Sequence, residues 1–112
     1  MRSTLVAQGP DGALTGVVAW ELVDNAAHLR GITVDPSERG HGTASHLVAR
    51  ALMALRGTDV EYAYLLTPGA ETLFERLGFW RVHRDRVPAR ILETAAYGEP
   101  SKGGVALVRR LG

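Results

Sequence analysis

The most regular hydrophobic pattern in the chain lies between residues 44 and 55. Apolar side chains recur there at positions i, i+3, i+4, i+7, i+8 and i+11, which is typical of a helix that packs one face on a sheet. The pattern predicts a long amphipathic helix, and Gly57 is expected to end it. The apolar positions are Ala44, Leu47, Val48, Ala51, Leu52 and Leu55.

Alternating apolar and polar positions before this helix predict strands. Two clusters rich in turn-forming residues, at residues 9–12 and 24–27, separate three such segments. Because the connections are short, we expect an antiparallel meander. The three strands are expected at residues 3–8, 13–23 and 28–34. One face of the second strand is expected to carry Leu14, Val18, Trp20 and Leu22.

The segments after the helix complete an α/β fold with a mixed sheet. A helix separates the third strand from the apolar run at 60–67, so these two strands are expected to lie parallel, joined by a right-handed crossover. In the following helix Leu73, Phe74 and Leu77 are expected to face inward, and Gly78 to end it. The remaining elements are expected at 68–77 (helix), 79–84 (strand), 88–97 (helix) and 104–109 (strand).

Small residues surround the start of the long helix, where unpaired backbone N–H groups and the positive end of the helix dipole favour an anion. Glycines let a phosphate approach the backbone, and an arginine adds positive charge. Because ligands in such folds sit beyond the carboxyl ends of parallel strands, Val34 and Thr67 are expected at the same crevice. The residues at the helix start are Arg39, Gly40, His41, Gly42, Thr43 and Ala44.

Composition narrows the possible functions. The 112 residues are expected to form one domain, 1–112, and a formal net charge of +1 provides no basic field for nucleic acid. The absence of cysteine excludes disulfides, a thiol nucleophile and thiolate metal sites. No apolar run approaches the ~20 residues that span a bilayer, so we expect a cytoplasmic protein without a membrane partner. The four histidines are scattered, and no metal site is expected.

The loop at residues 39–44, Arg-Gly-His-Gly-Thr-Ala, fits the Gln/Arg-x-x-Gly-x-Gly/Ala motif of the GNAT acetyltransferases, which the chain resembles. The preceding Ile-Thr-Val-Asp-Pro at 32–36 looks like the central strand of that superfamily. Its later helix is similar to the Phe-Glu-Arg-Leu-Gly-Phe run at 74–79. The resemblance implies a GNAT-like mixed sheet, with the pyrophosphate of acetyl-coenzyme A (acetyl-CoA) held in the loop.

A narrower match is to the small acetyltransferases linked to arsenic resistance. It depends on Tyr-Leu-Leu-Thr at 64–67, Ala-Glu at 70–71 and Val-Pro at 87–88, together with Ile91 and Thr94. Members of the superfamily usually begin with a strand and two helices, which this sequence is expected to lack. An uncovered sheet edge at 3–8 would invite pairing, so we expect a homodimer.

The resemblance also implies the chemistry, which is direct attack of an amine on the thioester without an acyl-enzyme. Glu21 is the candidate base, and a phenol, Tyr64 or Tyr97, is the candidate acid for the leaving thiolate. Backbone N–H groups of Ile32, Thr33 and Val34 are expected to polarise the carbonyl, and Phe74 to lie beside the coenzyme arm. Two further candidates face the acceptor, Arg30 for an acidic group and Glu71 for the amine.

The expected activity is transfer of an acetyl group to a small-molecule amine, an amino acid or a similar compound. One alternative is a coenzyme A-binding interaction module without catalysis. Another is a dinucleotide-binding module, since residues 40–45 approach Gly-x-Gly-x-x-Gly. Ser45 in place of the third glycine, the long turn before the loop and the antiparallel strands upstream argue against the dinucleotide alternative.

Overall fold

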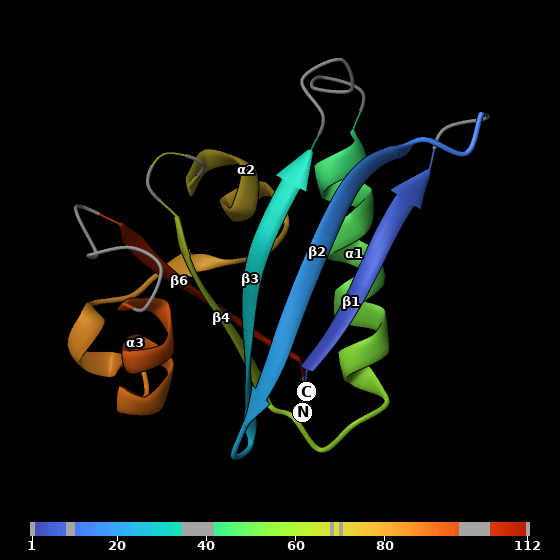
Figure 1. Ribbon diagram of the computed structural model, residues 1–112. Coiled ribbons are helices and arrows are strands. Elements are labelled where there is room, and N and C mark those ends of the chain that lie inside the picture. Colours follow the sequence, from blue (N-terminus) through green and yellow to red (C-terminus); the bar gives the residue numbers. More distant parts are fainter. Residues whose placement is uncertain are drawn as a thin grey trace.

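The computed structural model describes residues 2–8, 11–34, 42–67, 69, 71–96 and 104–111. In these residues six strands form one sheet in the order β1-β2-β3-β4-β6-β5 (Figure 1). The strands are β1 (Arg2–Gln8), β2 (Leu14–Val23), β3 (Ala26–Val34), β4 (Tyr62–Thr67), β5 (Trp80–Arg81) and β6 (Val105–Arg110). The helices are α1 (Thr43–Arg56), α2 (Glu71–Arg76), the 3-10 helix η2 (Arg84–Arg86) and α3 (Ala89–Ala96).

The sheet is mixed, as the sequence predicts. β1, β2 and β3 form an antiparallel meander, and β4, β6 and β5 are antiparallel neighbours. The parallel pair is β3 and β4, which α1 connects. The predicted α/β class with one parallel crossover is therefore confirmed.

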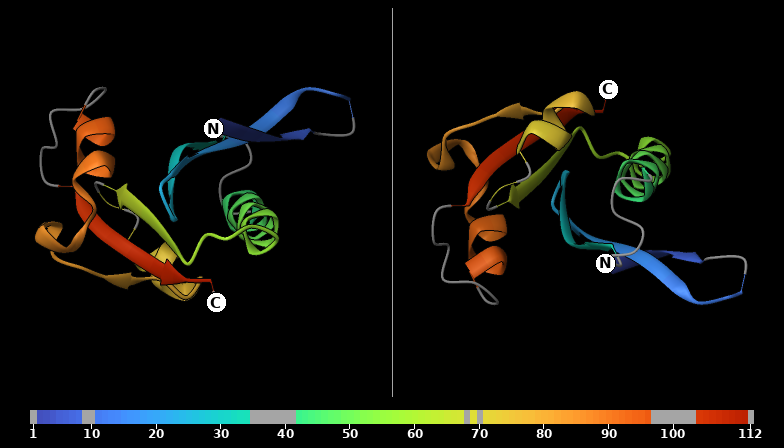
Figure 2. Two further views of the ribbon diagram at one scale, coloured as in Figure 1. Left: turned by 90° about the horizontal axis from the view of Figure 1, so that it is seen from below. Right: turned by 90° about the horizontal axis from the view of Figure 1, so that it is seen from above.

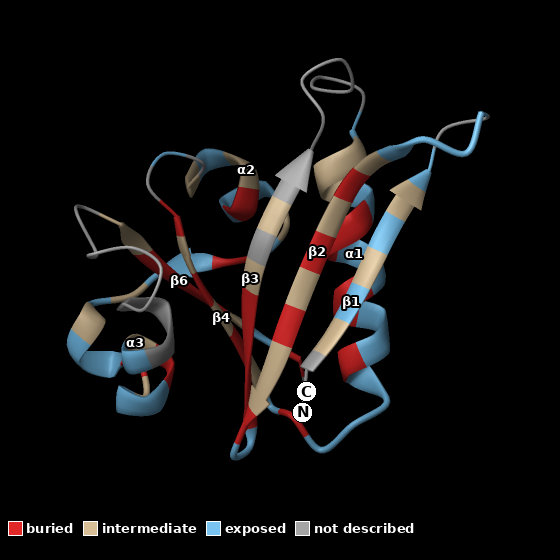
Figure 3. Ribbon diagram, in the orientation of Figure 1, coloured by how far each residue is buried: buried red, intermediate tan, exposed pale blue. Residues whose placement is uncertain are grey.

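Two helices cover opposite sides of the sheet (Figure 2). The predicted stripe of α1 is buried except for Ala44, which is half-buried, and it packs against apolar residues of β2 and β3 such as Trp20 and Leu29. On the other side, Ile91 of α3 packs against Val23 and Ala106. Figure 3 shows this burial as red segments along the middle of the sheet and on the inner face of α1.

Several boundaries differ from those expected. β4 begins at Tyr62 and α2 at Glu71, both later than predicted, and the strand expected at 79–84 is reduced to Trp80–Arg81 before η2. Leu14 is not buried with Val18 and Trp20: it is 61% exposed, next to the register shift at which β2 has one residue more than β1. The ends of short elements depend on tertiary pairing that a sequence pattern does not contain.

Gly78 ends α2 as predicted, and its backbone explains why. Its φ of +92° lies in the left-handed region that side chains rarely adopt. The guanidinium of Arg109 occupies the space that a Cβ would fill. Within the described ranges, no helix is both long and apolar enough to cross a bilayer.

Candidate functional site

β3 and β4 separate along their length, which makes their shared boundary the main irregularity of the sheet. They pair only at their first residues, and the last pair is His28 with Tyr64. β3 continues to Val34 and β4 to Thr67 without further pairing between them, and Figure 1 shows the two strands diverging toward their carboxyl ends. In the described residues, the facing backbones of the two strands therefore do not pair with each other beyond this point, a geometry that suits an extended ligand.

A bulge in β3 lies beside this divergence. Val17 pairs with Thr33 and Ala19 with Arg30, so two residues of β3, Gly31 and Ile32, stand opposite the single residue Val18. A bulge leaves one residue out of the ladder and turns its backbone groups away from the partner strand. The backbone N–H groups expected to polarise a carbonyl, at Ile32, Thr33 and Val34, lie in or directly after this bulge.

The start of α1 faces the same end of the sheet. Gly42 is its N-cap with φ of +77°, and its carbonyl accepts a hydrogen bond from the N–H of His46 at 2.9 Å. Among the described residues, no side chain caps this end, the first turn holds no acidic residue, and no atom lies within 4 Å of where a Cβ of Gly42 would be. Thr43 and Ala44 follow, both half-buried. The helix start is therefore suited to an anion.

Four polar side chains gather on the face of the sheet opposite α1. Glu21 and His28 are cross-strand partners, as are His28 and Tyr64. Arg30 lies two residues beyond His28, and its Nη1 is 3.8 Å from Oε2 of Glu21. The alternation of strand side chains places all four on one face, at the point where β3 and β4 part. We call Glu21, His28, Arg30 and Tyr64 the polar cluster.

Burial and charge shape the acid–base properties of the polar cluster. Burial, together with the positive charge of Arg30, lowers the pKa of His28 to about 4, and Glu21 opposes this shift. The imidazole is therefore neutral at pH 7, and its buried Nδ1 has no hydrogen-bond partner among the described residues. Burial and the neighbouring Tyr62 raise the pKa of Tyr64, so its phenol keeps its proton. Sequence reasoning missed His28 because it weighed this histidine only as a metal ligand.

The other predicted site residues have varied surroundings. Thr67 is the last residue of β4 and is buried. Phe74 is 4% exposed and stacks edge-on against Phe79, with ring centroids 5.8 Å apart, so core packing accounts for it without a ligand. Glu71 begins α2, with a buried Oε1 that has no hydrogen-bond partner in the described residues. The predicted site residues outside the described ranges are Arg39, Gly40, His41 and Tyr97.

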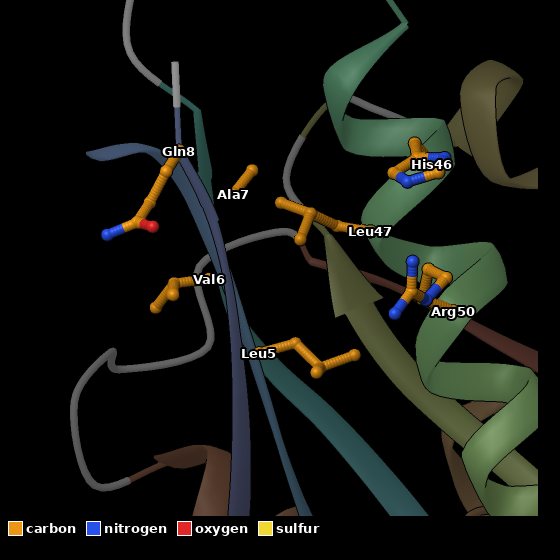
Figure 4. Close-up of a pocket in the computed structure, with 7 residues that line it drawn as sticks. All are labelled: Leu5, Val6, Ala7, Gln8, His46, Leu47 and Arg50. Carbon is orange, nitrogen blue, oxygen red and sulfur yellow. The ribbon is translucent and has the colours of Figure 1, made fainter. Parts of the chain in front are cut away.

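A separate hollow of about 230 Å³ lies between β1 and α1. Figure 4 shows Leu5 and Ala7 directed toward the helix and Val6 and Gln8 directed away from it. This hollow is on the outer edge of the sheet, away from the divergence of β3 and β4. In the described part of the chain, no cluster of three or more histidine, aspartate or glutamate side chains is arranged to hold a metal ion.

Comparisons with solved structures identify relatives of this fold. The N-acetylglutamate synthase of Neisseria gonorrhoeae, solved with coenzyme A and N-acetyl-glutamate, has a TM-score of 0.84 at 22% identity. The match covers 97% of this chain but only 26% of the synthase, so the chain spans about a quarter of that protein. A GNAT-family acetyltransferase from Staphylococcus aureus Mu50 has a TM-score of 0.81 at 18% identity, over 99% of this chain and 68% of its own.

A third relative and a family model complete the comparison. Rv2747 of Mycobacterium tuberculosis, solved with CoA and NLQ, has a TM-score of 0.81 at 25% identity, over 97% of this chain and 76% of its own. No curated protein sequence matches significantly. The family model described as the acetyltransferase (GNAT) domain matches residues 2–81. The chain therefore belongs to the GNAT acetyltransferase family.

Proposed function

We propose that this chain transfers the acetyl group of acetyl-CoA to the amine of a small molecule, an amino acid or a similar compound. The observation that carries the proposal is the parting of β3 and β4 beside the bulge at residues 31–32. At that place the described parts of β3 and β4 no longer pair with each other, and the polar cluster lies beside them. A relative solved with N-acetyl-glutamate supports an amino-acid-like acceptor. The closer similarity to arsenic-resistance acetyltransferases stays a prediction.

The residues present fit acetyl-CoA. The uncapped start of α1 at Gly42 would receive the pyrophosphate, and the diverging strands would receive the pantetheine arm along their unpaired backbone. The thioester carbonyl that acetyl-CoA brings would be the electrophile. N–H groups at Ile32, Thr33 and Val34 would polarise this carbonyl, since these residues lie in or directly after the bulge, on the part of β3 that does not pair with β4.

The polar cluster would manage the protons. Glu21, 19% exposed at its side chain, is reachable from solvent and would take a proton from the acceptor amine, directly or through water. Tyr64, whose raised pKa keeps its phenol protonated, would donate to the leaving thiolate, and Tyr97 is the alternative donor. Direct attack on the thioester needs no nucleophilic side chain, in keeping with a chain that contains no cysteine.

A matched pair of variants tests coenzyme binding at α1. Asparagine and aspartate both tolerate the left-handed backbone of Gly42, but only aspartate adds a negative charge. We expect Gly42→Asp to weaken acetyl-CoA binding at least about tenfold more than Gly42→Asn in isothermal titration calorimetry. Gly57→Asp, at the opposite end of the same helix, is the control. Equal affinities for the two Gly42 variants would contradict a diphosphate at this helix start.

A thiol-release assay over a panel of amino acids and amines tests the activity itself. Release that needs both acetyl-CoA and an amine supports the proposed transfer. Glu21→Gln is expected to lower kcat at neutral pH with little change in acetyl-CoA affinity, because the amide cannot accept a proton. Coenzyme binding without release for any acceptor would favour the alternative, a binding module without catalysis.

We also propose a homodimer formed through the outer edge of β1. β1 is an end strand of the sheet and pairs only with β2 in the described residues. Val6 and Leu14 are 51% and 61% exposed near this edge. Open strand edges with apolar side chains favour pairing with another chain. Static light scattering at micromolar concentration is expected to give twice the mass of one chain, and a monomer would contradict the proposal.

A further inference from the structure

Arg30 makes an incomplete interaction inside the polar cluster. Its side chain is one-third exposed, yet Nη1 is buried without a hydrogen-bond partner among the described residues. The 3.8 Å separation from Oε2 of Glu21 is longer than the 2.7–2.9 Å of a charge-assisted hydrogen bond. A buried donor without an acceptor is unfavourable, so a guanidinium held in this way is suited to a ligand that brings an acceptor.

Glu21 and Arg30 also present two opposite charges at a short, defined distance from each other. They extend from neighbouring strands on the same face, and both stay accessible to solvent. In an α-amino acid the amine nitrogen and the carboxylate carbon are about 2.5 Å apart, as two backbone bonds dictate. An amino acid can therefore contact both residues at once. Its carboxylate would lie against the guanidinium of Arg30, and its ammonium group against the carboxylate of Glu21.

Two residues beside the pair are small or uncharged. Ala19, the cross-strand partner of Arg30, has only a methyl side chain and is half-buried. Neutral His28 lies directly opposite Glu21 and adds no competing positive charge. The cluster lies where β3 and β4 begin to part, so a bound amine would be next to the unpaired strands proposed to hold the coenzyme arm.

We propose that Glu21 and Arg30 bind the zwitterionic head group of an α-amino acid acceptor, with the carboxylate on Arg30 and the ammonium on Glu21. This inference rests on the proposed acetyl transfer and narrows its acceptor to amines that carry an adjacent carboxylate. The ion pair opens slightly, and Arg30 exchanges a long contact with Glu21 for direct hydrogen bonds to the ligand. A bidentate geometry suits arginine and not lysine.

The first experiment compares L-amino acids with their carboxamides in the thiol-release assay. The two compounds share the amine and the side chain but differ in the negative charge. We expect kcat/KM for the amino acid to exceed that of its carboxamide by about 10- to 100-fold, the range of a charge-assisted hydrogen bond. Equal values for acid and carboxamide would overturn the inference and leave the proposed transfer intact. No thiol release with either compound would contradict both the inference and the proposed acetyl transfer.

The second experiment uses Arg30→Gln and Arg30→Lys. Arg30→Gln is expected to reduce kcat/KM for the amino acid to about the level of the carboxamide, mainly through KM, while the value for the carboxamide changes far less. Arg30→Lys is expected to restore part of the loss. Arg56→Gln removes the same charge from the exposed last turn of α1 and is expected to have no effect.

Two further measurements separate recognition from misfolding. Both Arg30 variants are expected to bind acetyl-CoA with the affinity of the unmodified chain, and to unfold at nearly the same denaturant midpoint. An equal loss toward the amino acid and the carboxamide would mean that Arg30 acts on the fold or on the coenzyme. That result would overturn the assignment of Arg30 to the acceptor carboxylate.

Discussion

The two faces of β3 differ in composition: one is apolar and the other carries polar side chains. Ala27 and Leu29 point toward α1 and are almost completely buried in an apolar core. His28 and Arg30, the residues that alternate with them, point to the other face and belong to the polar cluster. A strand buried on both faces is normally apolar throughout. Polar residues on the second face therefore indicate a site rather than a core.

This difference predicts that substitutions on one face of β3 change mainly stability, and that substitutions on the other face change mainly activity. Side chains on the α1 face remove apolar surface from water and stabilise the fold. On the other face, a buried imidazole with a partnerless Nδ1 and a long ion pair contribute little to stability. Along β3, substitutions at positions that face α1 should therefore change the free energy of unfolding, and those at the positions between them should change the rate of acetyl transfer.

The largest effect on stability is expected from Leu29→Ala. Leu29 is 2% exposed and packs in the cluster that joins α1 to the sheet, so its truncation leaves a cavity. We expect a loss of about 2–5 kcal/mol in the free energy of unfolding by urea. Met53→Ala on the exposed side of α1, where the side chain is 66% exposed, is expected to change it by less than about 0.5 kcal/mol. Similar losses for both would contradict the contrast between buried and exposed positions.

The second effect is a loss of stability in acid that depends on His28. Its pKa is about 4 in the folded chain and 6.5 when unfolded, so the unfolded state binds the proton more tightly. The free energy of unfolding is therefore unaffected by this proton above pH 6.5. It falls as the pH drops from 6.5 toward 4, by about 3 kcal/mol in all. His28→Gln should flatten this part of the curve of unfolding free energy against pH. His46→Gln, at an exposed histidine, should not.

The pH curve has a clear contrary outcome. If His28→Gln loses as much stability between pH 6.5 and 4 as the unmodified chain, the acid sensitivity belongs to carboxylates elsewhere. His28 would then be less buried in solution than its contacts with Glu21 and Arg30 indicate.

The two faces also mark how far the sequence could predict this molecule. The α1 face was predictable because it repeats with a helical or a strand period, and the buried positions of α1 agree with that stripe apart from half-buried Ala44. Gly78 was predictable from its chemistry, because only glycine readily takes a φ of +92° after a helix. Such signals depend only on residues that are close in sequence, so they can be recognised without knowledge of the tertiary structure.

The polar cluster was only partly predictable for the opposite reason. Glu21 and Tyr64 were named one at a time from the expected chemistry, and Arg30 as a candidate for an acidic acceptor. What brings them together with His28 is the register of β2, β3 and β4, which no periodicity contains. The bulge opposite Val18 was equally hidden, since one additional residue in a strand leaves no mark in composition.

A smaller effect, opposite in sign, is expected from His28→Leu at pH 7. Leucine has a similar size but no polar atom, so the variant removes a buried nitrogen without a hydrogen-bond partner. We expect a gain of about 1 kcal/mol in the free energy of unfolding by urea. A loss of stability as large as that of Leu29→Ala would mean that both faces of β3 work as core.

The smallest effect concerns the ion pair between Glu21 and Arg30. The two charges are 3.8 Å apart and partly exposed, so solvent screens their attraction. A double-mutant cycle with Glu21→Gln and Arg30→Gln is expected to give a coupling below about 1 kcal/mol in unfolding by urea. The same cycle measured on KM for an amino acid acceptor should show a much larger coupling, since both charges would contact one ligand. A strong coupling in unfolding and none in KM would assign the pair to the fold, and the two faces of β3 would no longer differ in purpose.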